Sequence, residues 1–527
     1  MIRKGNNHKC FIILLLTVVM LVVISYLPIL IAFASEETSV DINQEQSQDQ
    51  ITSPKGIDIP QESSLTHHSV NLNGQKVKYT ATVGFVPILD DKTGESMASF
   101  FFTAYTLKGE ENPSQRPITF AFNGGPGSSS IWLHLGAFGP KKVKLTSDSK
   151  EILPPPYYLV DNDYSILDLT DLVFIDPIGT GFSRFEGKAE GKDFWGVQED
   201  INVTAEFIRL YLSRNQRWAS PLYLAGESYG TTRAAGLSTA LQNIGIFPTG
   251  IILVSPILDY SLSIDNLSND QVYILNLPTY AATAWYHKKI ASRLQGNLDQ
   301  TLNEVREWCQ TDYLTALWKG NTLSKEERNQ IINRLVDYTG LPFDFIDRHN
   351  LRVSVFDFAN EILKDQKSMV SIYDSRVIGY GDYDINHDPI LAVISGGPFI
   401  STMNDYLQTQ LNFKTDRTYI PSSEEAHVLW NWIDKEQGDM GFPNTGFSLS
   451  NALKRTGFLR IFVASGLYDL ITPYDNTVHL VNHFDLPKDR LKNISFFTYE
   501  GGHMMYLNSE AHKKFKEDLI KFYESLQ

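Results

Sequence analysis

Cysteine is scarce in this chain of 527 residues, which contains only two. Basic side chains are also few, 46 against 61 acidic ones, so the formal net charge is -15. The scarcity of cysteine excludes a small domain held together by disulfide bonds. The acidic charge argues against nucleic acids and anionic membrane surfaces as partners. Length and a hydrophobic content of 42% indicate two domains, or one large α/β core with an insertion.

The N-terminal segment, residues 1–34, has the pattern of an export signal. Basic residues at positions 3–9 precede an apolar run over 11–34 that ends in Ala-Phe-Ala, a typical cleavage pattern. Because this run is also long enough to cross a bilayer, the segment is either a signal peptide or an uncleaved membrane anchor. We expect an exported protein: secreted, periplasmic or held at the cell envelope by this segment alone. Cleavage would leave Cys309 as the single cysteine, and exported chains without disulfide bonds are more typical of bacteria.

Short apolar runs alternate with helical patterns along much of the remaining chain. Such runs are typical of parallel strands that helices cover on both faces. The expected strands are residues 118–122, 172–175, 222–225, 251–254, 459–464 and 494–499, preceded by a hairpin of residues 77–86 and 99–107. Apolar side chains at three- and four-residue spacing predict helices over residues 195–218 and from about residue 510 onward.

The sequence thus predicts one α/β core that is interrupted by an insertion. Between the strands, longer and more polar helical stretches contain Trp285, Tyr286 and Trp308, which either line a side-chain pocket or pack in a core. A segment rich in Ser, Gln, Glu and Asp is expected to be a disordered linker. The predicted divisions are the signal or anchor 1–34, the linker 35–70, the first core part 71–262, the helical insertion 263–440 and the second core part 441–527.

The motif Gly-Glu-Ser-Tyr-Gly at 226–230 lies between an expected strand and an expected helix. Strand, G-x-S-x-G, helix is the pattern that displays a nucleophilic serine on a tight turn, here Ser228. A serine hydroxyl needs a histidine to remove its proton, and the histidine needs a carboxylate to fix its tautomer. Asp469 and His503 each follow one of the last two expected strands, in the chain order that this arrangement requires. We therefore predict a catalytic triad of Ser228, Asp469 and His503.

A glycine-rich loop, residues 123–130, follows the expected strand 118–122. Glycines let backbone N–H groups approach a substrate, so this loop is a candidate for stabilising the oxyanion of a tetrahedral intermediate. A tight turn without function and a phosphate-binding loop are the alternatives. The phosphate-binding alternative is disfavoured because neither the G-x-G-x-x-G pattern nor a lysine in the P-loop position is present.

With these motifs, the chain resembles a bacterial-type member of the serine carboxypeptidase family of α/β-hydrolases. Ordered segments across the chain carry the resemblance: FNGGPGSSS (122–130), FGPKKV (138–143), FIDPIGTGFS (174–183), GESYG (226–230), SGLYDLITP (465–473) and GGHMMY (501–506). The resemblance implies a mostly parallel sheet covered by helices, and the same triad. It further implies oxyanion donors from the N–H groups of Gly125 and Tyr229.

The resemblance also implies that Asn123, Gly124 and Glu227 bind the free C-terminal carboxylate of a peptide. Glu227 can take part only when it is protonated, since two facing carboxylates must share a proton. We therefore expect the Michaelis constant to rise with pH. Ala137 stands where many relatives have a second glutamate, which weakens the expectation of a strongly acidic optimum. Arg233 either supplies a compensating positive charge or is a solvated helix residue.

Two further departures from the family pattern lie in the glycine-rich loop and in the strand before it. Ser128 stands where some relatives have a cysteine, which agrees with the absence of disulfide bonds, and Ala121 replaces a tryptophan. The signal-like segment, the predicted triad and the family resemblance together imply an exported serine carboxypeptidase. Such an enzyme acts on peptides with a free C-terminus through an acyl-enzyme and without metal or other cofactor. An esterase or acyltransferase with the same triad is the alternative. A non-catalytic envelope-binding protein is disfavoured because all three triad positions are filled.

Overall fold

The computed structural model describes residues 63–526, except positions 73, 111, 267, 383 and 395 and residues 434–440. All these residues lie in the second of the two units into which the chain divides, Asp58–Gln527. The predicted signal or anchor and most of the predicted linker lie outside the described residues. No described helix combines the length and apolar character needed to cross a membrane.

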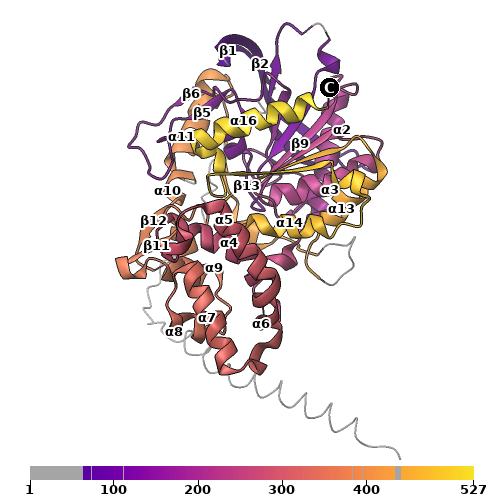
Figure 1. Cartoon of the computed structure of the whole chain (residues 1–527). Helices are drawn as coiled ribbons and strands as arrows, with labels where there is room; N and C mark the ends of the chain where they lie inside the picture. Colours follow the sequence, from indigo (N-terminus) through magenta and orange to yellow (C-terminus); the bar gives the residue numbers. More distant parts are fainter. Residues whose placement is uncertain are drawn as a thin grey trace, which may run out of the picture. The chain divides into compact units, whose positions relative to one another are not determined.

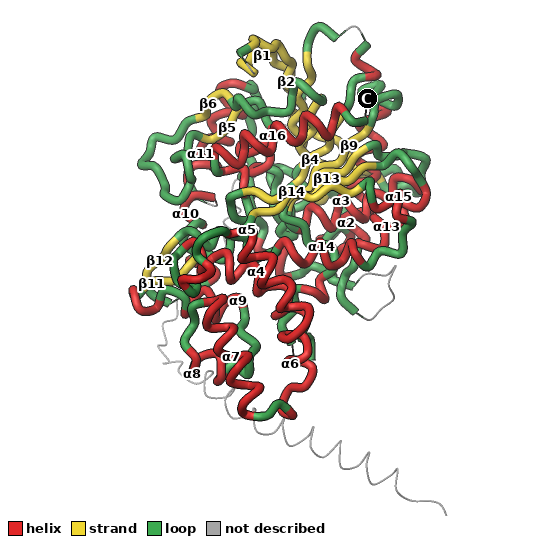
Figure 2. Tube along the Cα trace, viewed as in Figure 1, coloured by secondary structure: helices red, strands yellow, loops and turns green. Residues whose placement is uncertain are grey.

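A twisted sheet forms the centre of the molecule (Figures 1 and 2). Its strand order is β1-β2-β3-β7-β4-β9-β10-β13-β14, with β8 (Arg184–Phe185) paired to β3. β1 to β3 pair antiparallel, and the strands from β7 to β14 run parallel to one another. The strands are β1 (Ser64–Leu72), β2 (Gln75–Leu89), β3 (Ser96–Leu107), β4 (Ile118–Phe122), β7 (Asp171–Ile175), β9 (Leu222–Glu227), β10 (Gly250–Val254), β13 (Arg460–Gly466) and β14 (Ile494–Tyr499). The expected hairpin and parallel strands are confirmed.

β1 begins inside the segment 35–70 that the composition assigned to a disordered linker, so that assignment is wrong from Ser64 onward. The strand pairs with β2 along its whole length, from Ser64 opposite Val83 to Leu72 opposite Gln75. Val70 and Leu72 bury their side chains while most of the other residues stay partly exposed. An edge strand needs only one apolar face, so its polar composition does not prevent it from ordering.

Helices cover both faces of the sheet because successive strand residues point to opposite sides. Ile252 packs in one core with α16 (Ser509–Glu524), while Ile251 and Leu253 pack in the other core. The second core is closed by α2 (Val197–Arg214), α3 (Tyr229–Asn243) and α13 (Gly446–Arg455). Figure 1 shows α16 on the opposite side of the sheet from α3 and α13. The predicted helices over 195–218 and from residue 510 are thereby confirmed.

Between β10 and β13 the chain is mainly helical, as expected for an insertion. Its helices between residues 271 and 361, α4 to α9, lie together beside one end of the sheet (Figure 2). These helices have their own core, in which Trp308 stacks on Tyr313, so core packing is the observed use of that aromatic residue. The helices after residue 390, α10 and α11, pack instead in the core that contains Ile252. The described helices and strands are α4 (Gln271–Tyr286), α5 (Leu298–Trp308), α6 (Leu314–Lys319), α7 (Lys325–Thr339), α8 (Phe343–Arg348), α9 (Val355–Glu361), β11 (Ser368–Val370), β12 (Ile378–Tyr380), α10 (Leu391–Ile394), α11 (Gly397–Asp405) and α12 (Glu424–Val428).

Candidate active site

The candidate nucleophile, Ser228, stands alone between a strand and a helix. β9 ends at Glu227 and α3 begins at Tyr229. The backbone of Ser228 has φ 57° and ψ -128°, a conformation that costs a residue with a side chain about 1–3 kcal/mol. Its N–H group donates a hydrogen bond to the carbonyl oxygen of Val254 (3.0 Å), which ties the turn to the end of β10. This is the strand-to-helix turn that the motif predicts.

The two glycines of the motif let three backbone segments meet around this turn. A Cβ atom at Gly226 would collide with the carbonyl group of Gly230. A Cβ atom at Gly230 would lie 2.6 Å from the carbonyl oxygen of Phe122, at the end of β4. Any side chain at either position would therefore push the Ser228 turn away from the glycine-rich loop.

His503 and Asp469 form the second half of the predicted triad. Nδ1 of His503 lies 2.8 Å from Oδ2 of Asp469, and both side chains are buried. Asp469 also accepts hydrogen bonds from the N–H groups of Ile471 (2.9 Å) and Thr472 (3.0 Å) and from the Thr472 hydroxyl (2.7 Å). Burial lowers the pKa of His503, but the adjacent Asp469 carboxylate outweighs burial, so the pKa is raised above its ordinary value. This pairing holds the proton on Nδ1 and leaves Nε2 as the basic nitrogen.

The insertion supports the loop that carries Asp469. Tyr468 and Leu470, on either side of this aspartate, pack in the hydrophobic core of the insertion. The N–H group of Leu470 donates to the carbonyl oxygen of Ile372 (3.0 Å). In turn, the N–H group of Ser375 donates to the carbonyl oxygen of Tyr468 (3.0 Å). Residues 371–376 of the insertion thus fix the position of the candidate acid.

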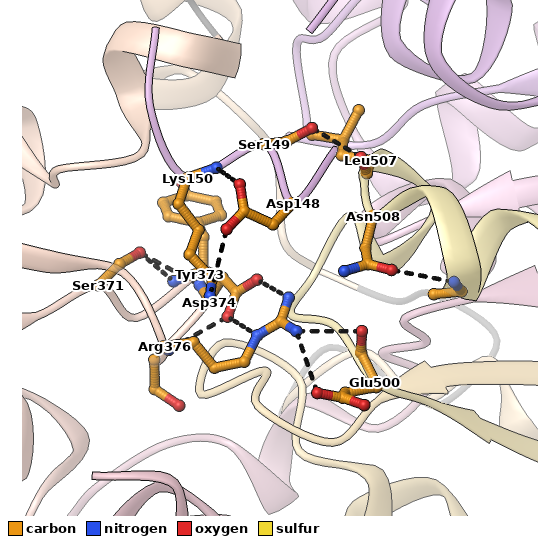
Figure 3. A network of polar contacts seen from close by, with 12 residues as sticks. Asp148, Ser149, Lys150, Ser371, Tyr373, Asp374, Arg376, Glu500, Leu507 and Asn508 are labelled. Atoms are coloured by element: carbon orange, nitrogen blue, oxygen red, sulfur yellow. Dashed lines mark hydrogen bonds and ion pairs between the residues drawn. The ribbon is translucent and has the colours of Figure 1, made fainter. Parts of the chain in front are cut away.

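The same segment also contacts the loop that carries the histidine, as Figure 3 shows. The N–H group of His503 donates to the carbonyl oxygen of Tyr373 (2.6 Å). Close by, Arg376 forms a buried ion pair with Asp374 (2.6 Å) and donates to the carbonyl oxygen of Glu500 (3.2 Å). The segment therefore holds the acid and base loops at once, a connection that the sequence pattern did not reveal.

A cavity of about 180 Å³ brings most of the predicted residues together. It is lined by Asn123, Gly124, Gly125, Glu227, Ser228 and His503, together with apolar side chains that include Trp132, Ile394 and Met504. Asp469 lies behind His503, and Tyr229 follows Ser228. In the described part of the chain, no group of three or more His, Cys, Asp or Glu side chains is placed to hold a metal ion.

The glycine-rich loop lies against the start of α3. A Cβ atom at Gly124 would collide with the backbone nitrogen of Tyr229, so only glycine fits there. Gly125 has φ +101°, a left-handed conformation that also favours glycine. Because Tyr229 is the first residue of α3, its N–H group has no acceptor within the helix. The N–H groups of Gly125 and Tyr229 are thus candidates to hold a developing oxyanion beside Ser228.

Glu227 is a buried carboxyl group with two hydrogen-bond donors on one oxygen. Its Oε2 accepts from Asn123 Nδ2 (3.0 Å) and from the hydroxyl of Tyr506 (2.6 Å). The orientation of Asn123 is fixed because its Oδ1 accepts from the N–H group of Leu133 (3.0 Å). Burial is the main reason why the pKa of Glu227 is raised to about 7. This carboxyl group is therefore largely protonated in mildly acidic solution.

Both sequence-based interpretations of Arg233 are wrong, because its side chain is neither solvated nor part of the cavity lining. It is completely buried and donates from Nε to Oδ2 of Asp200 (2.7 Å) on α2. Its Nη1 donates to the backbone carbonyl oxygen of Asn123 (2.8 Å). Arg233 therefore supports the glycine-rich loop from behind.

Comparison with known proteins identifies the family. The model of the serine carboxypeptidase family matches residues 72–509. Serine carboxypeptidase-like 2 of Arabidopsis thaliana is 30% identical over 219 residues, covering 38% of this chain and 48% of that protein. Serine carboxypeptidase-like 7 of the same plant is 34% identical over 127 residues, covering 24% and 28% of the two chains. The chain thus spans less than half the length of these curated relatives.

The fold is similar to that of a solved structure. Kex1Δp, a prohormone-processing carboxypeptidase from Saccharomyces cerevisiae, matches with a TM-score of 0.52 and 17% identity, over 85% of this chain and 91% of that one. This likeness confirms the predicted α/β-hydrolase fold, with its mostly parallel sheet and flanking helices. Since the family match extends over most of its length, the chain belongs to the serine carboxypeptidase family.

Proposed function

We propose that this protein is a serine carboxypeptidase, which removes residues from the C-termini of peptides through an acyl-enzyme. The observation that carries the proposal is the arrangement inside one cavity. Ser228 and His503 line it together with Asn123 and Glu227, a buried amide and a buried carboxyl group suited to a substrate carboxylate. A general esterase has no need of such a pair beside its nucleophile.

In the proposed mechanism, His503 Nε2 removes the hydroxyl proton while Ser228 Oγ attacks the scissile carbonyl carbon. The N–H groups of Gly125 and Tyr229 hold the negative charge of the tetrahedral intermediate. Collapse of the intermediate breaks the peptide bond, and His503 gives the proton to the departing amine. Water, activated by the same histidine, then cleaves the acyl-enzyme and restores Ser228.

The C-terminal carboxylate of the substrate is proposed to meet Asn123, Gly124 and protonated Glu227. A neutral carboxyl group donates a hydrogen bond to the incoming carboxylate, whereas an ionised carboxylate repels the substrate. With the pKa of Glu227 raised to about 7, binding is favoured below neutral pH and weakens above it. Ala137, where many relatives have a glutamate, leaves this carboxyl group without a second acid partner.

We expect KM for an N-blocked dipeptide to be low at pH 5 and to rise as Glu227 ionises around pH 7. Glu227→Gln keeps a neutral hydrogen-bonding group at every pH, so its KM is expected to stay nearly constant. Steady-state kinetics between pH 4 and 9 measure both profiles. A wild-type KM that does not change between pH 4 and 8 would show that Glu227 does not bind the carboxylate.

The choice of substrate separates the proposed activity from that of an esterase. The free acid of an N-blocked dipeptide is expected to react at least about 100-fold faster, in kcat/KM, than its C-terminal amide, which leaves Asn123 and Glu227 without their charged partner. Release of the C-terminal residue, measured by mass spectrometry, gives both rates. Equal turnover of the free acid and of its C-terminal ester would instead support the esterase alternative.

Export from a bacterial cell is part of the proposal. The signal-like pattern of residues 1–34 supports export. Cys309 is a free, buried cysteine, and exported chains without disulfide bonds are more typical of bacteria. Secretion, retention in the periplasm and anchoring by residues 11–34 all fit this pattern. Sequencing the N-terminus of the protein recovered from each cell fraction distinguishes them, and an intact chain confined to the cytoplasm would contradict export.

A further inference from the structure

Tyr506 contacts Glu227, the candidate carboxylate-binding residue, from a position just after the loop that carries His503. It lies in the short helix η11 (Met505–Leu507), three residues after His503. Its hydroxyl donates to Oε2 of Glu227 (2.6 Å), and only 1% of either residue is exposed. The histidine loop therefore holds both the catalytic base and the carboxyl group that is proposed to bind the substrate.

We propose that Tyr506 is a positioning residue of the substrate-carboxylate site. Its hydroxyl and the Asn123 amide occupy Oε2 of Glu227, so that the proton of this carboxyl group is carried on Oε1 and offered to the substrate. This inference rests on the proposed carboxypeptidase activity. It assigns to Tyr506 a role that acts through Glu227 rather than by contact with the peptide.

The packing around Tyr506 supports the assignment. A Cβ atom at Gly136 would lie 2.8 Å from Cε2 of Tyr506, so the ring lies directly against this glycine. The next residue is Ala137, which is completely buried and carries no polar side chain. This packing holds the Tyr506 hydroxyl at hydrogen-bond distance from Glu227.

The charges around Glu227 define how Tyr506 acts. A protonated His503 lowers the pKa of Glu227, and the Asp469 carboxylate raises it slightly. Burial and the neighbouring Glu227 raise the pKa of Tyr506 well above its usual range, so its hydroxyl remains a donor. A donated hydrogen bond stabilises the ionised form of Glu227 and thereby lowers its pKa. Removing the hydroxyl should therefore extend protonation of Glu227 to higher pH.

The test compares Tyr506→Phe with the wild-type enzyme on an N-blocked dipeptide, with KM and kcat measured from pH 4 to 9. We expect the rise in KM to move upward by about one pH unit. The pH dependence of kcat, which reports His503 in the enzyme–substrate complex, should stay in place. Tyr523→Phe is the matched control, since its buried hydroxyl bonds Thr119 (2.7 Å) outside the site, and its KM profile should match that of the wild type.

Two further variants keep the inference testable if Tyr506→Phe does not fold. Gly136→Ala pushes the Tyr506 ring away without removing its hydroxyl, and the same upward shift is expected. In the double variant Gly136→Ala/Glu227→Gln, the KM profile should match that of Glu227→Gln alone, because the introduced amide does not titrate. An unshifted KM profile in the folded Tyr506→Phe or Gly136→Ala variant would overturn the role of Tyr506. A wild-type KM that is independent of pH would instead overturn the proposed carboxylate site itself.

Discussion

Ser228→Ala is expected to lower kcat by about a million-fold, the scale known for removal of the triad serine from a serine protease. Without Oγ, no acyl-enzyme forms, and His503 has no hydroxyl from which to remove a proton. The N–H groups of Gly125 and Tyr229 remain, so a small residual acceleration over the uncatalysed reaction is expected. The release of C-terminal residues from a peptide library by both proteins, read by mass, measures the loss. A fluorophosphonate probe should add one covalent adduct to the wild-type protein and none to the variant.

The fold should survive this substitution. Alanine keeps the small size of serine at the turn, and the left-handed conformation of residue 228 strains both residues alike. Ser238→Ala is the matched control, because Ser238 lies buried in α3, the helix that follows Ser228, and donates a hydrogen bond to the carbonyl oxygen of Ala235. It should retain both trimming and labelling. Undiminished trimming by Ser228→Ala at an unchanged melting temperature would exclude Ser228 as the nucleophile.

The parts of the fold that the sequence predicted are those with strong local patterns. β4 and β14 have the predicted bounds, because short apolar runs with turns at both ends permit one interpretation. The candidate triad residues could be brought together from the sequence because each follows a core strand, and the carboxyl ends of parallel strands lie along the same edge of a sheet. This common edge explains why Ser228 and His503 line the same cavity.

The features that the sequence did not predict depend on distant partners. β1 is polar in composition and orders by pairing with β2. Arg233 has the sequence context of an ordinary helix arginine, and its burial follows from Asp200 on another helix, which neutralises its charge. Composition and periodicity describe a residue's own element, so they do not reveal which side chain from elsewhere will neutralise or cover it.

The same limit applies to the support of the active site. Tyr506 belongs to the block GGHMMY that indicated His503, yet only the folded chain brings its hydroxyl to Glu227. The segment 371–376 belongs to an insertion with no recognisable motif, although it binds the loops of both the acid and the base. The candidate reactive residues could therefore be named from the sequence, whereas the residues that position them could not.

Asp469→Asn is expected to lower kcat by about 10⁴-fold at neutral pH, the loss known for the same change in the triad of a serine protease. In the wild type, Oδ1 accepts from the N–H groups of Ile471 and Thr472, and Oδ2 faces Nδ1 of His503. The asparagine oxygen keeps the two backbone donors, so the new NH₂ group faces Nδ1. The histidine proton then moves to Nε2, which can no longer accept the proton of Ser228.

The expected pH dependence identifies this cause. The Asp469 carboxylate raises the pKa of His503, so the variant should lose that effect, and the rise of its residual kcat with pH should occur at lower pH. Thr472→Val is the control, because it removes one hydroxyl donor to Asp469 (2.7 Å) but leaves the carboxylate facing His503. Its kcat should fall by no more than about tenfold. A loss of similar size in both variants would mean that the geometry of the loop, rather than the charge and tautomer control of Asp469, determines the activity.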